Sequence, residues 1–110
     1  MTGEISFIEL GSGDPVLTRR FFADLFGWPF TPMRGDNGCF DTPTARAGLH
    51  GEDPGGLITV FFRVGDLTAA VARVRELGGE SEDPGPPQPG FGRFALCRDP
   101  QGLHFGLHEV

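Results

Sequence analysis

Two short stretches near the ends of the two halves of the chain are nearly alike. AGLHGE occupies 47–52 and FGLHEV occupies 105–110, and both contain Gly-Leu-His. The glycines of the two stretches, Gly48 and Gly106, are separated by 58 positions in a chain of 110 residues. A repeat of this size predicts a duplicated unit of roughly 50–55 residues. Two copies are too few for a solenoid, so we expect the two halves to pair.

Each half of the sequence predicts a strand, a helix and three further strands. First strands are expected at 4–10 and 57–64, which are rich in β-branched and aromatic residues. An aspartate that can cap a helix follows each strand, Asp14 before a proline and Asp66 in the second half, and glycines at 27 and 78–79 end the helices. Further strands are expected at 28–33, 39–42, 45–51, 93–98 and 103–109, with turns at 34–38 and 99–102 and a Pro/Gly-rich loop at 83–92.

The first helix has apolar side chains at three- and four-residue spacing, which predicts a single apolar face. The side chains of this face are Val16, Leu17, Phe21, Phe22, Leu25 and Phe26.

Composition narrows the classes of protein and partner. A length of 110 residues indicates one domain, and a net charge of −6 argues against a nucleic-acid partner. No apolar run is long enough for a membrane span, and the first residues do not resemble a signal peptide. Cys39 and Cys97, also 58 positions apart, hold matching places in the two halves and give no disulfide framework. We therefore expect buried reduced thiols in a cytoplasmic protein.

Three stretches resemble the vicinal oxygen chelate superfamily, which includes glyoxalase I, the bleomycin-resistance proteins and the extradiol dioxygenases. These are RRFFADLFGWPF (19–30), VFFRVGDLTAAVARVRELGG (60–79) and GRFALCRDPQGLHFGLHE (92–109). The resemblance implies an α+β fold with two tandem βαβββ modules, at about 1–54 and 55–110, in a single domain over 1–110. It further implies that the mixed sheet curls around a cup and that the chain forms a homodimer.

The metal-dependent members of the superfamily hold a divalent ion in this cup on four side chains. The resemblance places the four positions at Phe7, Gly48, Thr59 and Gly106. Phenylalanine and glycine have no side-chain donor, and a threonine hydroxyl is a poor ligand. We therefore expect no metal site and no cofactor, with a divalent metal at an atypical site as the alternative.

Glycine in the middle of a strand lowers the stability of the strand, so we expect a structural or functional reason for Gly48 and Gly106. One interpretation is that they clear the cup for a bulky ligand. The other is that they allow close packing of strands or of a side chain such as Phe7.

Side chains alternate across a strand, so His50 and His108 share a face with the two glycines, as do Arg46 and His104. The resulting ligand-binding set is Phe7, Glu9, Gly48, His50, Thr59, Phe61, Arg63, Gly106 and His108. Within it His50, His108 and Glu9 are weak candidates for acid–base catalysis or for a replacement metal site. The alternatives are that both histidines lie in water at the rim and that Glu9 pairs with Arg63. Trp28 can line the cup, the dimer interface or the core.

Three functions remain open from the sequence. The leading hypothesis is a metal-free protein that binds a small aromatic or amphipathic molecule. The alternative is an enzyme of the superfamily, a lyase, isomerase or dioxygenase, with an atypical metal site or with His/Glu acid–base catalysis. A regulatory or interaction module without a ligand is the third.

Overall fold

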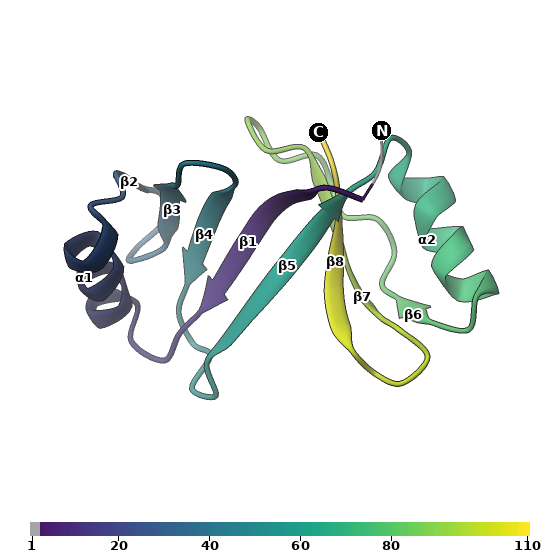
Figure 1. Cartoon of the computed structure of the whole chain (residues 1–110), viewed down its shortest axis with the longest axis horizontal. Coiled ribbons are helices and arrows are strands. Elements are labelled where there is room, and N and C mark those ends of the chain that lie inside the picture. The colour runs from purple at the N-terminus through teal and green to yellow at the C-terminus, as the bar shows by residue number, and fades with distance from the viewer. Residues whose placement is uncertain (1–2) are drawn as a thin grey trace. The chain divides into compact units, whose positions relative to one another are not determined.

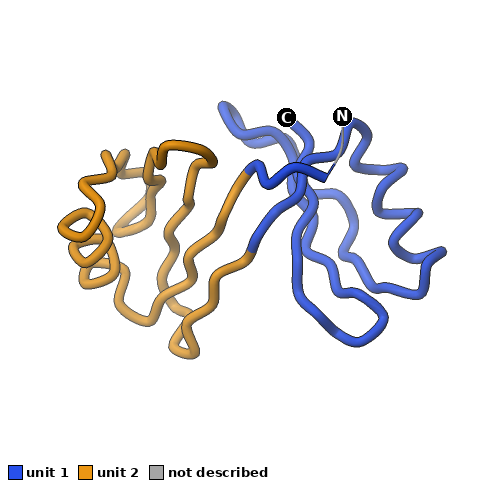
Figure 2. The backbone as a smooth tube through the Cα atoms, in the orientation of Figure 1, with its two compact units in different colours: residues 1–6, 60–110 blue, residues 7–59 orange. Residues whose placement is uncertain are grey.

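The computed structural model describes residues 3–110 and contains eight strands and two helices within that range (Figure 1). The chain divides into two compact units, coloured separately in Figure 2. Unit 1 comprises Met1–Ser6 and Val60–Val110, and unit 2 comprises Phe7–Thr59. The unit boundaries therefore cross the first strand of each module, and the expected module division at about residues 54 and 55 stays a prediction.

Unit 2 is a βαβββ module with a mixed four-stranded sheet in the order β2-β3-β4-β1. β1 is parallel to β4, and the other two pairings are antiparallel. The edge strand β2 ends with Pro32, and Pro29 precedes it, as suits prolines, which cannot donate a ladder hydrogen bond. Its elements are β1 (Ile5–Gly11), α1 (Pro15–Phe26), β2 (Phe30–Pro32), β3 (Gly38–Asp41) and β4 (Arg46–His50).

Unit 1 repeats this arrangement in the order β5-β8-β7-β6. β5 is parallel to β8, and β7 pairs antiparallel with both β8 and β6. Its elements are β5 (Leu57–Arg63), α2 (Leu67–Glu76), β6 (Glu80–Ser81), β7 (Arg93–Arg98) and β8 (His104–Glu109). The expected α+β fold of two βαβββ modules is thereby confirmed, and the two-residue strand β6 is an element that the sequence did not locate.

Both helices begin where the sequence predicted. Asp14 accepts a hydrogen bond from the Leu17 backbone N–H at 3.2 Å, and Asp66 accepts one from the Ala69 N–H at 3.1 Å. These bonds satisfy donors that the first helical turn leaves without a partner. Gly27 ends α1 in the left-handed conformation, with φ of 72°. Part of the fold is therefore specified locally, by caps that need no tertiary contact.

Each unit has its own apolar core between its helix and one face of its sheet. In unit 1 the buried residues are Leu67, Val71, Ala95, Cys97 and Leu107. In unit 2 they are Leu10, Phe40, Ala47 and Leu49, against which Phe22, Ala23, Trp28 and other half-buried side chains pack. Trp28 is therefore a core-packing residue of unit 2, stacked against Phe22 and Phe26.

The sheet of unit 2 covers only part of the apolar face of α1. None of the residues of α1 is buried, whereas α2 buries Leu67 and Val71. Phe22 packs into the core of unit 2, but Phe21 and Leu25 remain exposed. The sheet therefore covers only a part of the apolar surface of α1.

The two cysteines are buried and free, as expected, but they do not hold matching places. Cys39 pairs with Gly48, whereas Cys97 pairs with Phe105 rather than with Gly106. The register of β7 against β8 thus differs by one residue from that of β3 against β4. A shift of one residue turns a side chain to the other face of a sheet, so Cys97 lies in the core beneath α2.

No helix within residues 3–110 is both long enough and apolar enough to cross a lipid bilayer.

Candidate functional site

The sheet of each unit has one face against its helix and a second face on the opposite side, which we call the open face. In β1 of unit 2, Ile8 and Leu10 pack toward α1. Alternation along the strand therefore places Phe7 and Glu9 on the open face. The same alternation in β4 places Gly48 and His50 there, between the core residues Ala47 and Leu49. These four residues belong to the set that the sequence analysis expected to share a face.

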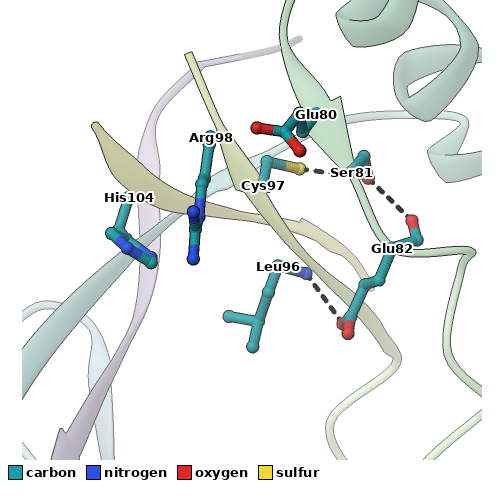
Figure 3. Close-up of a pocket in the computed structure, with 7 residues that line it drawn as sticks. All are labelled: Glu80, Ser81, Glu82, Leu96, Cys97, Arg98 and His104. Carbon is teal, nitrogen blue, oxygen red and sulfur yellow. Dashed lines mark hydrogen bonds between the residues drawn. The ribbon is translucent and has the colours of Figure 1, made fainter. Parts of the chain in front are cut away.

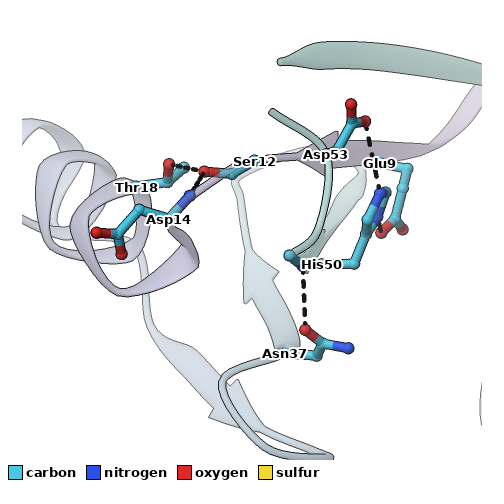
Figure 4. A network of polar contacts seen from close by, with 8 residues as sticks. Glu9, Ser12, Asp14, Thr18, Asn37, His50 and Asp53 are labelled. Atoms are coloured by element: carbon cyan, nitrogen blue, oxygen red, sulfur yellow. Dashed lines mark hydrogen bonds and ion pairs between the residues drawn. The ribbon is translucent and has the colours of Figure 1, made fainter. Parts of the chain in front are cut away.

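The open face of unit 2 brings Glu9, His50 and Asp53 together (Figure 4). Nδ1 of His50 is 2.6 Å from Oε2 of Glu9, and its Nε2 is 3.8 Å from Oδ2 of Asp53. The imidazole side chain is 42% exposed and the Glu9 side chain 28% exposed. Because an ionised carboxylate only accepts hydrogen bonds, Nδ1 donates to Glu9 and Nε2 is left facing Asp53.

Backbone contacts hold this group in place. In the parallel pairing of β1 with β4, Gly11 lies opposite His50. A Cβ at Gly11 would lie 2.9 Å from Nε2 of His50 and overlap Oδ2 of Asp53, so the glycine leaves room for both side chains. The segment after β4 is anchored by hydrogen bonds from the Asp53 N–H to the Ser12 carbonyl at 3.2 Å and from the Gly51 N–H to Oδ1 of Asn37 at 3.2 Å. Asp53 is a site residue that the sequence analysis missed, because it lies in a loop where alternation gives no direction.

Burial raises the pKa of Glu9 above its ordinary value of 4.5, and the hydrogen bond and charge of His50 act in the opposite direction. Desolvation therefore favours the protonated form of the Glu9 carboxyl group, whereas the hydrogen bond and charge of His50 favour its ionised form.

The space above Gly48 is occupied by neighbouring side chains of its own unit. A Cβ at Gly48 would overlap Oε1 of Glu9 and lie 3.0 Å from Cζ of Phe7. Of the two interpretations offered for this glycine, the structure supports close packing by Phe7 and, in addition, by Glu9.

In unit 1 an aromatic group takes the corresponding place. Phe61 lies opposite Gly106 in the β5–β8 pairing, and a Cβ at Gly106 would overlap the Phe61 ring. Phe61 meets Phe94 edge-to-face with ring centroids 5.3 Å apart, and Phe94 stacks on His108 at 4.4 Å. Phe94 also went unpredicted, although alternation in β7 could have placed it on the same face as His108.

His108 is buried and held at both ring nitrogens. Nε2 is 2.5 Å from the carbonyl oxygen of Phe91, which can only accept, so Nε2 carries a proton. Nδ1 of the neutral ring then accepts from the Ser6 hydroxyl at 2.8 Å. His108 thus ties the loop at 83–92 to β8 and to Ser6 of β1, whereas half-exposed His50 presents its ring to solvent. Of the other predicted residues, Thr59 is half-buried and Arg63 exposed.

The residues at the four superfamily metal positions do not fit a divalent ion. Phe7, Gly48 and Gly106 offer no donor atom, and Thr59 offers one hydroxyl. Within the described residues 3–110, no three His, Cys, Asp or Glu side chains are grouped so that they could hold a metal ion.

A further pocket of about 350 Å³ lies at the β6–β7–β8 side of unit 1 (Figure 3). Cys97, a core residue of unit 1, is among the lining residues; its thiol donates to Oγ of Ser81 at 3.3 Å, and burial raises the pKa of the thiol. This thiol is therefore held in its unreactive protonated form. The lining residues are Glu80, Ser81, Glu82, Leu96, Cys97, Arg98 and His104.

The sequence profile of the glyoxalase-like domain matches residues 8–108. Among curated proteins, the anthracycline biosynthesis protein DnrV of Streptomyces peucetius is 31% identical over 127 aligned residues, which cover 96% of this chain and 46% of that protein. The chain thus spans about half the length of the curated relatives it matches.

Two solved structures illustrate the likeness of fold. Methylmalonyl-CoA epimerase from Mycobacterium tuberculosis superimposes with a TM-score of 0.73 at 18% identity, covering 97% of this chain and 87% of that one. Homoprotocatechuate 2,3-dioxygenase from Arthrobacter globiformis superimposes with a TM-score of 0.78 at 20% identity, covering 97% of this chain and 36% of that one. The chain belongs to the glyoxalase-like domain family, within the vicinal oxygen chelate superfamily.

The packing of Phe61 on Gly106 can be tested with Gly106→Ala. The added methyl group must displace the Phe61 ring, so we expect the free energy of unfolding to fall by about 1–3 kcal/mol. Gly65→Ala is the matched control, because a Cβ at Gly65 meets no atom within 4 Å. Denaturant titration measures both, and equal stability of the two variants would contradict the packing role.

The burial of Glu9 predicts a pH-dependent contribution to stability. Because the folded-state pKa lies above 4.5, the folded protein holds this proton more tightly than the unfolded chain does. The resulting stabilisation is complete below pH 4.5 and is lost as pH rises through the folded-state pKa. Glu9→Gln removes this titration, so we expect the wild type to lose stability relative to Glu9→Gln as pH rises. Denaturant titrations over a pH series measure the difference, and a constant difference would refute the prediction.

Proposed function

We propose that this chain is a metal-independent binding protein for a small aromatic or amphipathic organic molecule. The observation that carries the proposal is the open face of unit 2. There Phe7 and Gly48 stand where metal-dependent members of the superfamily have ligands, and Phe7 and Glu9 fill the space that a longer side chain at 48 would need. The face also carries Glu9, His50 and Asp53, whose side chains can hydrogen-bond an organic ligand.

The polar part of the ligand binds at Glu9, His50 and Asp53 in this proposal. The carboxylates of Glu9 and Asp53 flank the half-exposed imidazole of His50, so the three side chains carry a net negative charge when the imidazole is neutral. An amine or another N–H or O–H donor is the complementary ligand group, since charge-assisted hydrogen bonds to carboxylates are strong. The net charge of −6 favours the approach of a cationic ligand in the same way.

The name of one relative supports an aromatic ligand. DnrV is described as an anthracycline biosynthesis protein, and anthracyclines are fused-ring aromatic compounds. The resemblance covers 96% of the present chain, so the ligand class is a reasonable starting point for binding experiments. Anthracyclines that carry an amino sugar combine an aromatic body with a cationic group, and the cationic group is complementary to the carboxylates of Glu9 and Asp53.

Titration of an amino-sugar anthracycline, followed by its own fluorescence, tests the proposal. We expect saturable binding that is unchanged by a metal chelator, and an affinity roughly tenfold lower in Glu9→Gln, because a charged hydrogen-bond partner is lost. Glu76→Gln, an exposed glutamate on α2, is the matched control and should bind as the wild type does.

Two outcomes would contradict the proposal. Binding that disappears with the chelator and returns with a divalent ion would refute metal independence. Equal affinity of Glu9→Gln and wild type would refute the placement of the ligand at Glu9.

Acid–base catalysis is the second candidate function, and the 2.6 Å contact between His50 and Glu9 favours it. Glu9 fixes the proton at Nδ1, which leaves Nε2 as the atom able to take a proton from a substrate. Methylmalonyl-CoA, the substrate named in one structural neighbour, is a suitable carbon acid for a test.

In this reading, deuterium from D₂O enters C2 of methylmalonyl-CoA faster with the wild type than with His50→Gln, as measured by mass spectrometry. Equal rates with the wild type, with His50→Gln and without protein would exclude this reaction.

A further inference from the structure

Arg98 of β7 and His104 of β8 lie directly opposite one another in the antiparallel pairing of these strands. Opposite residues of such a pair project from the same face of the sheet, which here is the open face of unit 1, because Cys97 points into the core. Both side chains are exposed and line the pocket of about 350 Å³ (Figure 3). Within the described residues 3–110, neither side chain makes a hydrogen bond or an ion pair with another residue. Two groups that can donate hydrogen bonds, which we call the Arg98–His104 pair, therefore line this pocket without a protein acceptor.

The turn between the two strands fixes the spacing of the Arg98–His104 pair. Oδ1 of Asp99 accepts hydrogen bonds from the backbone N–H groups of Gln101 and Leu103, both at 2.8 Å. The Asp99 N–H in turn donates to the Leu103 carbonyl at 3.0 Å. The backbone of the pair is therefore held in place before a ligand arrives, so that binding costs little more than side-chain freedom.

The charges around the Arg98–His104 pair favour a negatively charged ligand. Protonation of His104 places two cations directly opposite one another, which destabilises a pair of strands. Glu80 of β6 lies opposite Arg98 on its other side, but these two side chains form no ion pair in the structure of residues 3–110. Figure 3 shows the guanidinium group turned away from the Glu80 carboxylate. An anion between the guanidinium and the imidazole accepts hydrogen bonds from both groups and offsets their charge.

Neighbouring side chains narrow the class of anion. The guanidinium fork fits the two oxygens of a carboxylate or of a phosphate. Glu80 and Glu82 also line the pocket, and the chain carries a net charge of −6, so repulsion is greater for a doubly charged phosphate than for a singly charged carboxylate. Leu96, which is 51% exposed, lies on the same face as Arg98 and offers an apolar contact. An organic monocarboxylate with an apolar body therefore complements this pocket best.

We propose that the Arg98–His104 pair is a binding site for the carboxylate group of an organic acid. The guanidinium of Arg98 binds both carboxylate oxygens, an N–H of the His104 ring donates to one of them, and Leu96 contacts the apolar body. The site lies wholly within unit 1 and does not depend on the ligand proposed for unit 2.

Titration of isotope-labelled protein with benzoate, followed by NMR at constant ionic strength, tests the proposal. We expect saturable shifts of the Arg98 and His104 signals. In Arg98→Gln the affinity for benzoate should fall about tenfold, because a charged bidentate partner of the carboxylate is lost. Arg73→Gln is the matched control, since Arg73 is an exposed arginine of α2 and its replacement changes the net charge equally.

Two further titrations separate this site from general attraction between an anion and a protein. His104→Leu should bind benzoate about threefold more weakly than the wild type, because one hydrogen bond is lost. Inorganic phosphate should bind the wild type more weakly than benzoate does, because it meets the repulsion of Glu80 and Glu82 and makes no apolar contact.

Several results would overturn the proposal. These are an absence of saturation with benzoate, equal affinity of Arg98→Gln and the wild type, equal affinity of His104→Leu and the wild type, and tighter binding of phosphate than of benzoate.

Discussion

In each unit a side chain of the first strand lies across a mid-strand glycine of the last strand. Glu9, with Phe7, covers Gly48 in unit 2, and Phe61 covers Gly106 in unit 1. Both glycines lie in the parallel pairing that joins the first and last strands of a module. A Cβ at either position would collide with these side chains, so the packing of the open faces depends on the two glycines. The superfamily resemblance places two of its four metal-ligand positions at these same glycines.

The duplicated frame carries different chemistry in its two copies. Glu9 and Phe61 occupy equivalent places opposite the two glycines, and His50 and His108 follow those glycines at the same distance along the chain. In unit 2 the result is a half-exposed hydrogen-bonded pair of an acid, Glu9, and a base, His50. In unit 1 the result is a stack of Phe94 on buried His108, and both ring nitrogens of that histidine have hydrogen-bond partners. His50 and Glu9 are therefore accessible to a ligand, whereas His108 holds the loop at 83–92.

The sequence was most informative where structure is specified locally. The caps at Asp14 and Asp66 and the alternation around Gly48 and Gly106 follow from a few adjacent residues, and the structure confirms them. Features that depend on strand register could not be predicted from the sequence. Cys97 faces the core because β7 is shifted by one residue, and no local pattern reports such a shift. The contact of His50 with Glu9 likewise requires the alignment of β1 with β4, over a separation of 41 residues. The width of sheet available to α1, which decides that Phe21 stays exposed, is also set by tertiary structure.

A native mass spectrum of the protein, equilibrated with a mixture of divalent ions and an amino-sugar anthracycline, tests the central claim most directly. That claim is that aromatic and glycine residues have replaced a metal centre in a fold that still binds small molecules. The account predicts a stoichiometric adduct of the organic compound on protein that carries no metal ion. One firmly bound divalent ion per chain would contradict it, and would show that side chains other than those at the four superfamily positions form a metal site.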